Sequence, residues 1–146
     1  MSEENIKHLE FVQNVITRMN SNSFQIKGMT ITIIAALFAV YAAKPNVVFI
    51  LIAIIPTVLF WLLDAYYLLQ ERKYRFLYDN ISGLKNNLVV PLFSMSTEKI
   101  EDSITDKKEK RKYQYFCVVF SESLRIMYLP LVLVLLIISL VLHLLN

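Results

Sequence analysis

Three apolar runs constrain this chain of 146 residues more than any other feature. They cover residues 29–43, 47–63 and 126–145, and the second extends to residue 69 if one acid, Asp64, is included. A bilayer core about 30 Å thick takes about 20 helical residues to cross. A soluble bundle would need more polar cover than a composition of 56% apolar residues provides. The runs therefore predict an all-α membrane protein with three transmembrane helices.

The length suits a single domain, and we expect one transmembrane domain over residues 1–146. Its helices extend beyond the spans on the cytoplasmic side. The predicted segments are an amphipathic cytoplasmic helix over 1–27, spans over 28–43, 47–69 and 124–145, and a cytoplasmic region over 70–123.

The first helix is expected to begin at Ser2, whose hydroxyl can cap it. Apolar residues then recur at spacings of three and four as far as Met19, which is the pattern of one helical face. Residues 20–23 are polar and predict a junction before the first span. The apolar face can pack on the chain's own cytoplasmic part, lie on the membrane surface or contact another copy.

The turn between the first two spans is Lys44-Pro45-Asn46, because proline disfavours helix in the residue before it. Spans joined by so short a turn are antiparallel neighbours. The second helix is expected to run on to residue 79, with Gly83 as its stop.

The region that follows is predicted to be irregular over residues 84–106. A single helix then begins near Asp106 and continues through the third span. Such a helix would have about 40 residues and a length of about 60 Å.

The basic residues predict the orientation of the chain. Lysines and arginines gather before the first span and between the second and third spans, while the opposite side carries Lys44 and His143. By the positive-inside rule, the N-terminus and the long loop are cytoplasmic and the C-terminus is outside. The expected location is a bacterial inner membrane, crossed three times.

Catalytic patterns are missing from the sequence. Two glycines cannot form a phosphate-binding loop, and Cys117 is the only cysteine. No serine lies in a nucleophile motif, and the two histidines lie near opposite ends of the chain. We therefore expect no enzyme, no metal site and no cofactor.

Charged residues near the cytoplasmic ends of the spans are the most informative candidates. At about 1.5 Å per residue from the outer ends, Asp64, Lys27 and Arg125 fall at a similar depth. Glu122 is an i,i+3 neighbour of Arg125. Charges at such depths pair or face a cavity, so Asp64 is predicted to pair with Arg125 or Lys27. The group can be a structural clasp, a pore lining or side chains that reach the interface without a role. Thr30, Thr32 and Ser139 are weaker lining candidates, whose hydroxyls can instead bond to their own helix.

A basic run lies in the cytoplasmic region. Its cations are a topology signal and a contact for anionic lipid or for a partner. No aromatic platform accompanies them, so we do not expect nucleic acid as a partner. The residues of this run are Lys107, Lys108, Lys110, Arg111 and Lys112.

Three segments carry a resemblance to a known family. They read FVQNVITRMNSNSFQIKGMTITIIAALFAVYA, IPTVLFWLLDAYYLLQERKYRFLYD and FSMS, within residues 11–96. The Phe-Trp-x-x-Asp-Ala-Tyr-Tyr and Gln-Glu-Arg pieces make the chain similar to a widespread family of small uncharacterised bacterial membrane proteins. The arrangement of helices also resembles the two-span effector modules of bacterial conflict systems, which implies membrane permeabilisation.

These patterns lead to two hypotheses about function. The first is a homo-oligomeric effector that forms a pore in the inner membrane or perturbs it, for example in anti-phage defence. The alternative is a non-conducting anchor or accessory subunit for a cytosolic partner. In both hypotheses the lipid bilayer is a partner, and symmetric self-assembly is the default.

Overall fold

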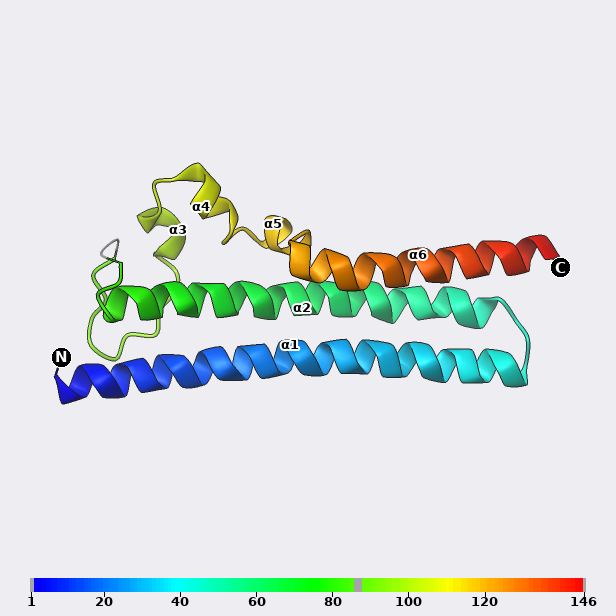
Figure 1. Cartoon of the computed structure of the whole chain (residues 1–146), viewed down its shortest axis with the longest axis horizontal. Coiled ribbons are helices and arrows are strands. Elements are labelled where there is room, and N and C mark those ends of the chain that lie inside the picture. The colour runs from blue at the N-terminus through cyan, green and yellow to red at the C-terminus, as the bar shows by residue number, and fades with distance from the viewer. Residues whose placement is uncertain (1, 86–87, 146) are drawn as a thin grey trace. The chain divides into compact units, whose positions relative to one another are not determined.

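The computed structural model describes residues 2–85 and 88–145, and over these residues it contains helices and no strands. Three of the helices are long and apolar enough to cross a membrane, as the apolar runs predict. Figure 1 shows α1 and α2 running antiparallel, with α6 beside α2. The helices are α1 (Glu3–Ala43), α2 (Val48–Ile81), α3 (Ile100–Ser103), α4 (Lys107–Arg111), α5 (Tyr115–Val119) and α6 (Glu122–Leu145).

Helix α1 begins as predicted, because the Asn5 N–H donates to Ser2 Oγ at 3.3 Å. Residues 20–23, the polar junction before the first span, lie inside α1, which is one continuous helix of 41 residues. Serine and asparagine lower helix stability by only a fraction of a kcal/mol each, and this segment has neither proline nor glycine. Ser23 and Ile26 are buried, so packing continues through the segment.

The turn after α1 joins it directly to α2. The Asn46 Oδ1 atom accepts a hydrogen bond from the Val48 N–H at 3.0 Å, which satisfies one free donor of the α2 N-terminus. Helix α2 runs to Ile81, and Gly83 follows it with φ = 80°. Glycine adopts this left-handed conformation without steric strain, so Gly83 ends the helix as expected.

The long helix predicted from Asp106 through the third span is wrong, because the structure divides that stretch into α4, α5 and α6. Asp106 caps α4 by accepting from the Lys108 N–H. At the other end, the Lys112 and Tyr113 N–H groups bond three residues back rather than four, which closes α4 after 5 residues. Like charges along this run oppose a longer helix, while Tyr113 is buried.

The second break lies between α5 and α6. The Trp61 indole N–H donates to the Val119 carbonyl oxygen at 2.9 Å. In a continuous helix this carbonyl oxygen would accept a hydrogen bond from the backbone N–H four residues later. The indole N–H takes that place, so it competes directly with continuation of the helix. Helix α6 then begins at Glu122.

The chain divides into two compact units that share α1 and α2. Unit 1 comprises Met1–Ser23 and Tyr66–Val118, and unit 2 comprises Phe24–Ala65 and Val119–Asn146. In unit 1, Val12, Ile16 and Leu77 form a buried core. In unit 2, the buried core consists of Ile50, Ala53 and Leu135, packed by residues of α1, α2 and α6.

A histidine fixes the segment before α3 in unit 1. His8 is 1% exposed, and its Nδ1 accepts from the Phe93 N–H at 3.3 Å. The Nε2 atom must then carry the proton, and it donates to the Ser94 carbonyl oxygen at 3.0 Å. Phe93 has φ = 59°, an uncommon conformation for a residue with a side chain. One imidazole therefore holds a strained turn against α1.

Candidate functional site: a buried ion pair joined by a tyrosine

The centre of the candidate site in unit 2 is an ion pair between α1 and α2. Lys27 Nζ lies 2.7 Å from Asp64 Oδ2, and the Asp64 side chain is 0% exposed while that of Lys27 is 26% exposed. The structure thus brings together two of the residues predicted to share this depth. Burying a carboxylate is costly unless a cation and hydrogen-bond donors accompany it.

The third helix contributes a tyrosine to the same carboxylate. The Tyr128 hydroxyl, from α6, donates to Asp64 Oδ2 at 3.0 Å, and its side chain is fully buried. Sequence reasoning considered charged partners and missed this neutral donor. The signal was present, because a tyrosine inside an apolar run needs a partner for its hydroxyl. Asp64 therefore links α1, α2 and α6 through one oxygen atom.

Trp61 holds the tyrosine ring in place. The Trp61 and Tyr128 rings are nearly parallel, with an interplanar angle of 4° and centroids 6.0 Å apart. Phe120 meets the same indole edge-on at 5.9 Å. Because the indole N–H is also bonded to Val119, the indole is fixed at both its face and its edge. The orientation of the Tyr128 hydroxyl towards Asp64 thus depends on packing as well as on the hydrogen bond.

Threonine hydroxyls on α1 and α2 in unit 2 bond to their own helix. Thr30 and Thr57 are buried and donate to the Ile26 and Ala53 carbonyl oxygens, each at 2.8 Å. Thr32 donates in the same way to the Gly28 carbonyl oxygen at 3.0 Å. Ser139 is also buried. The Thr30 and Thr32 hydroxyls are thus bonded to their own helix, which is the alternative considered for these two residues from the sequence.

The other two charges predicted near Asp64 lie apart from the pair. Arg125 and Glu122 are exposed, and in the described part of the chain neither forms an ion pair. Leu124 and Tyr128 are buried four residues apart on the inward face of α6. Arg125 follows Leu124 directly, so it lies about 100° around the helix from that face.

The basic run covers α4 and its C-cap residue in unit 1, with four exposed side chains and one half-buried. The exposed ones are Lys107, Lys108, Arg111 and Lys112, and the half-buried one is Lys110. One ion pair attaches α3 to α2, and another attaches α4 to the loop after α2. Lys73 Nζ lies 3.0 Å from Glu101 Oε1, and Lys85 Nζ lies 2.6 Å from Glu109 Oε1.

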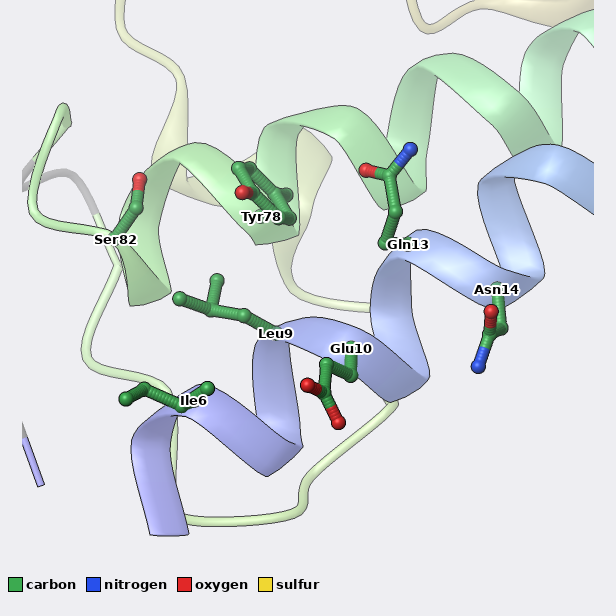
Figure 2. A pocket seen from close by; sticks show the side chains of 7 residues that line it. All are labelled: Ile6, Leu9, Glu10, Gln13, Asn14, Tyr78 and Ser82. Atoms are coloured by element: carbon green, nitrogen blue, oxygen red, sulfur yellow. The ribbon is translucent and has the colours of Figure 1, made fainter. Parts of the chain in front are cut away.

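Unit 1 also contains a cavity of about 600 Å³ between the N-terminal part of α1 and the C-terminal end of α2. Figure 2 shows Leu9 and Gln13 extending from α1 towards α2, where Tyr78 lies. Its wall combines apolar side chains with amide, hydroxyl and carboxylate groups. The residues that line it are Ile6, Leu9, Glu10, Gln13, Asn14, Tyr78 and Ser82.

Substituting Tyr128→Phe is expected to lower the free energy of unfolding by about 1.5–3 kcal/mol, the range for a hydrogen bond to a charged group. The ring and its stacking on Trp61 are kept, so the change reports the hydroxyl alone. Denaturant unfolding of the full chain in micelles measures it. The matched control is Tyr66→Phe at an exposed position, which should change stability by less than about 0.5 kcal/mol. Equal effects of the two substitutions would argue against the Tyr128–Asp64 bond.

Unit 1 is expected to lose stability above about pH 10. The hydrogen bond to Glu109 raises the pKa of Lys85, and burial raises the pKa of Tyr113. A group whose pKa is higher in the folded chain contributes stability below its unfolded pKa and loses it as pH rises through the folded value. Both groups therefore act in the same direction at alkaline pH.

Hydrogen exchange of unit 1 between pH 9 and 11, corrected for the intrinsic rate, measures this loss. Tyr113→Phe removes one of the two groups and should make the loss shallower than in the unsubstituted chain. A steeper loss in this variant would contradict the assignment.

Among the described residues, no group of three or more histidine, cysteine, aspartate or glutamate side chains is arranged to hold a metal ion. Comparisons with family models, curated proteins and solved structures gave no match to the chain. The resemblance to a family of bacterial membrane proteins therefore stays a prediction.

Proposed function

We propose that the chain is a non-conducting integral membrane protein that anchors a helical cytoplasmic module. The observation that carries the proposal is the burial of Asp64 between Lys27 and Tyr128 within a single chain. Its charge is balanced and its oxygen is shared by three helices. This arrangement supports a clasp that holds the spans together.

A pore lining calls for different surroundings. Polar groups that line a water path must be accessible to water, whereas Asp64 is completely buried and the threonine hydroxyls are bonded to their own backbone. The described surface of unit 2 is instead rich in large apolar side chains on α1, α2 and α6, which suits lipid. Examples are Met29, Ile31, Ile55, Leu59, Ile126, Ile137 and Leu140, all exposed.

Unit 1 supplies the surface for a partner. The cavity in Figure 2, called the groove below, has Ile6, Leu9 and the Tyr78 ring as apolar parts of its wall, and Ile6 is exposed. A groove that combines such apolar side chains with polar groups between antiparallel helices suits an amphipathic helix of a cytosolic protein. The positive-inside rule would put unit 1 on the cytoplasmic side, where such a partner is available.

Flux through reconstituted liposomes tests the absence of conduction. Purified protein at high density should give no potassium flux or dye efflux above that of empty liposomes. A leak that depends on Asp64, lost in Asp64→Ala, would contradict the proposal and favour a pore.

Cys117 tests the orientation, because it is exposed and is the only cysteine in the chain. A membrane-impermeant maleimide should label it in opened membranes and leave it unlabelled in intact cells. Labelling in intact cells would overturn the cytoplasmic assignment of unit 1.

Photo-cross-linking tests the groove in native membranes. A cross-linker at Ile6 is expected to give one discrete adduct with a cytosolic protein, and Leu9→Asp should remove the adduct. The same cross-linker at Val89, which is 94% exposed and lies outside the groove, should give none. Identical patterns from the two positions would contradict docking in the groove.

A homo-oligomeric effector that perturbs the membrane, including one used in anti-phage defence, is the second candidate. The exposed positions Gly28, Ala35 and Ala39 on α1 favour it, since small residues let spanning helices approach closely. Exposed Arg125 and Glu122 could pair between copies. A defined oligomer in nanodiscs together with a liposome leak would favour this candidate over the anchor.

A further inference from the structure

Unit 1 contains a half-buried cation with few partners. The Arg72 guanidinium donates one hydrogen bond, from Nη1 to the Lys112 carbonyl oxygen at 3.2 Å. In the part of the chain that the structure describes, it forms no ion pair. The neighbouring carboxylate of Glu71 is held by Arg75, whose Nη2 lies 2.7 Å from Glu71 Oε1. Partial burial lowers the pKa of Arg72, which reflects the removal of water from its charge.

A cavity of about 330 Å³ adjoins this guanidinium. Three cations and two aromatic rings lie in its wall, together with one carboxylate. The Phe76 and Tyr113 rings meet edge to face, with centroids 5.6 Å apart. The lining residues are Arg72, Arg75, Phe76, Asp79, Lys112 and Tyr113.

The free donors of Arg72 indicate the chemistry of the ligand. A guanidinium has five N–H groups in a planar fork that matches the oxygens of a phosphate, and charged groups removed from water require a counter-charge. Lys112, at the C-terminal end of α4, supplies a second cation from another segment. The wall therefore favours an anion with several oxygen acceptors.

The position of the cavity along α2 indicates the source of the anion. Arg72 comes three residues after Leu69, where the predicted span ends, which is about 5 Å along a helix. In the membrane that the proposed function assumes, this is the depth of the phospholipid headgroups. Exposed Phe116 follows the basic run on the way to α6, as suits a segment at a lipid surface.

We propose that this cavity binds the phosphate of an anionic phospholipid, with Arg72 and Lys112 contacting the phosphate oxygens. The proposal rests on the membrane insertion assumed above and adds a specific headgroup site to it. The Asp79 carboxylate lines the same cavity and repels an anion, so it lowers the affinity for the phosphate. Substitution of Asp79 can remove this repulsion.

Native mass spectrometry of the full-length protein in detergent, titrated with dioleoylphosphatidylglycerol, tests the site. Arg72→Gln should weaken the first lipid adduct about tenfold, as expected for a lost charge-assisted hydrogen bond. The matched control is Arg111→Gln, which removes an exposed cation of the same α4 run that does not line the cavity. It should change the affinity by less than about twofold.

Asp79→Asn provides a test with the opposite sign, since it should strengthen lipid binding while leaving the cations in place. This variant keeps the proposal falsifiable even if Arg72→Gln fails to fold. Equal effects of Arg72→Gln and Arg111→Gln, or weaker binding in Asp79→Asn, would overturn the site.

Titration with inorganic phosphate distinguishes a lipid headgroup from a soluble phosphate compound as the ligand. If it binds as tightly as the lipid and with the same dependence on Arg72, the ligand is a soluble phosphate compound and the lipid assignment is wrong. Adduct formation in detergent does not depend on conduction or orientation, so its failure is distinct from failure of the anchor function.

Discussion

Lys27→Met is expected to lower the free energy of unfolding of the full-length protein by about 3–5 kcal/mol, because it leaves the buried Asp64 carboxylate without its cation. Asp64→Asn should have a smaller effect. The Lys27 side chain is partly exposed and can turn its ammonium towards water, whereas the completely buried Asp64 carboxylate cannot reach water. Removing the lysine charge is thus expected to cost more stability than removing the aspartate charge.

Combining Lys27→Met with Asp64→Leu is expected to recover most of the stability lost in Lys27→Met. The double substitution removes both charges, and apolar residues of similar volume commonly replace a buried ion pair without loss. Denaturant unfolding in micelles measures the four proteins of this double-mutant cycle: the unsubstituted chain, Lys27→Met, Asp64→Leu and the double variant. Lys44→Met, in the exposed turn, is the control. Additive effects of the two substitutions would show that the pair does not couple α1 to α2.

Leu77→Ala is expected to destabilise unit 1 by about 2–5 kcal/mol, the range for a buried leucine truncated to alanine. Leu77 is completely buried against Val12 and Ile16, so the substitution leaves a cavity in the core of this unit. Hydrogen exchange should quicken in residues 3–23 and 66–81, while the backbone of α6 keeps its protection. Val89→Ala, at a highly exposed position, should change nothing measurable.

Equal loss of protection in α6 would mean that the two units unfold together. The two compact units would then not be independent units of unfolding.

The three long helices could be predicted because their signals are local. A bilayer sets the length of an apolar run, and Pro45 together with Asn46 ends one helix and starts the next within a few residues. Gly83 could be assigned as a stop for the same reason, since its left-handed conformation is a property of glycine itself.

The breaks around α5 could not be predicted in this way. The Trp61 bond to the Val119 carbonyl oxygen joins residues 58 apart in the chain. In the segment before α3, the bond of His8 to the Ser94 carbonyl oxygen likewise joins residues 86 apart. Side-chain groups this far away compete with local helix formation, and no periodicity in either segment reveals them.

The candidate site was predicted in part. Depth counting brought Lys27 and Asp64 together, because both positions are fixed by the same short turn. On α6, depth alone could not distinguish Arg125 from Tyr128, which lies one turn further on. Their rotational positions decide which one faces Asp64, and that rotation depends on packing by Leu124 and Leu135.

The ion pair between Lys27 and Asp64 has an electrical consequence. Moving one elementary charge across a membrane potential of 100 mV changes the energy by about 2.3 kcal/mol. In the membrane that the proposed function assumes, the paired side chains carry no net charge, so a shift of the helices that moves both would move no net charge of this pair through the field. The pair itself is therefore expected to add no voltage dependence to the packing of unit 2.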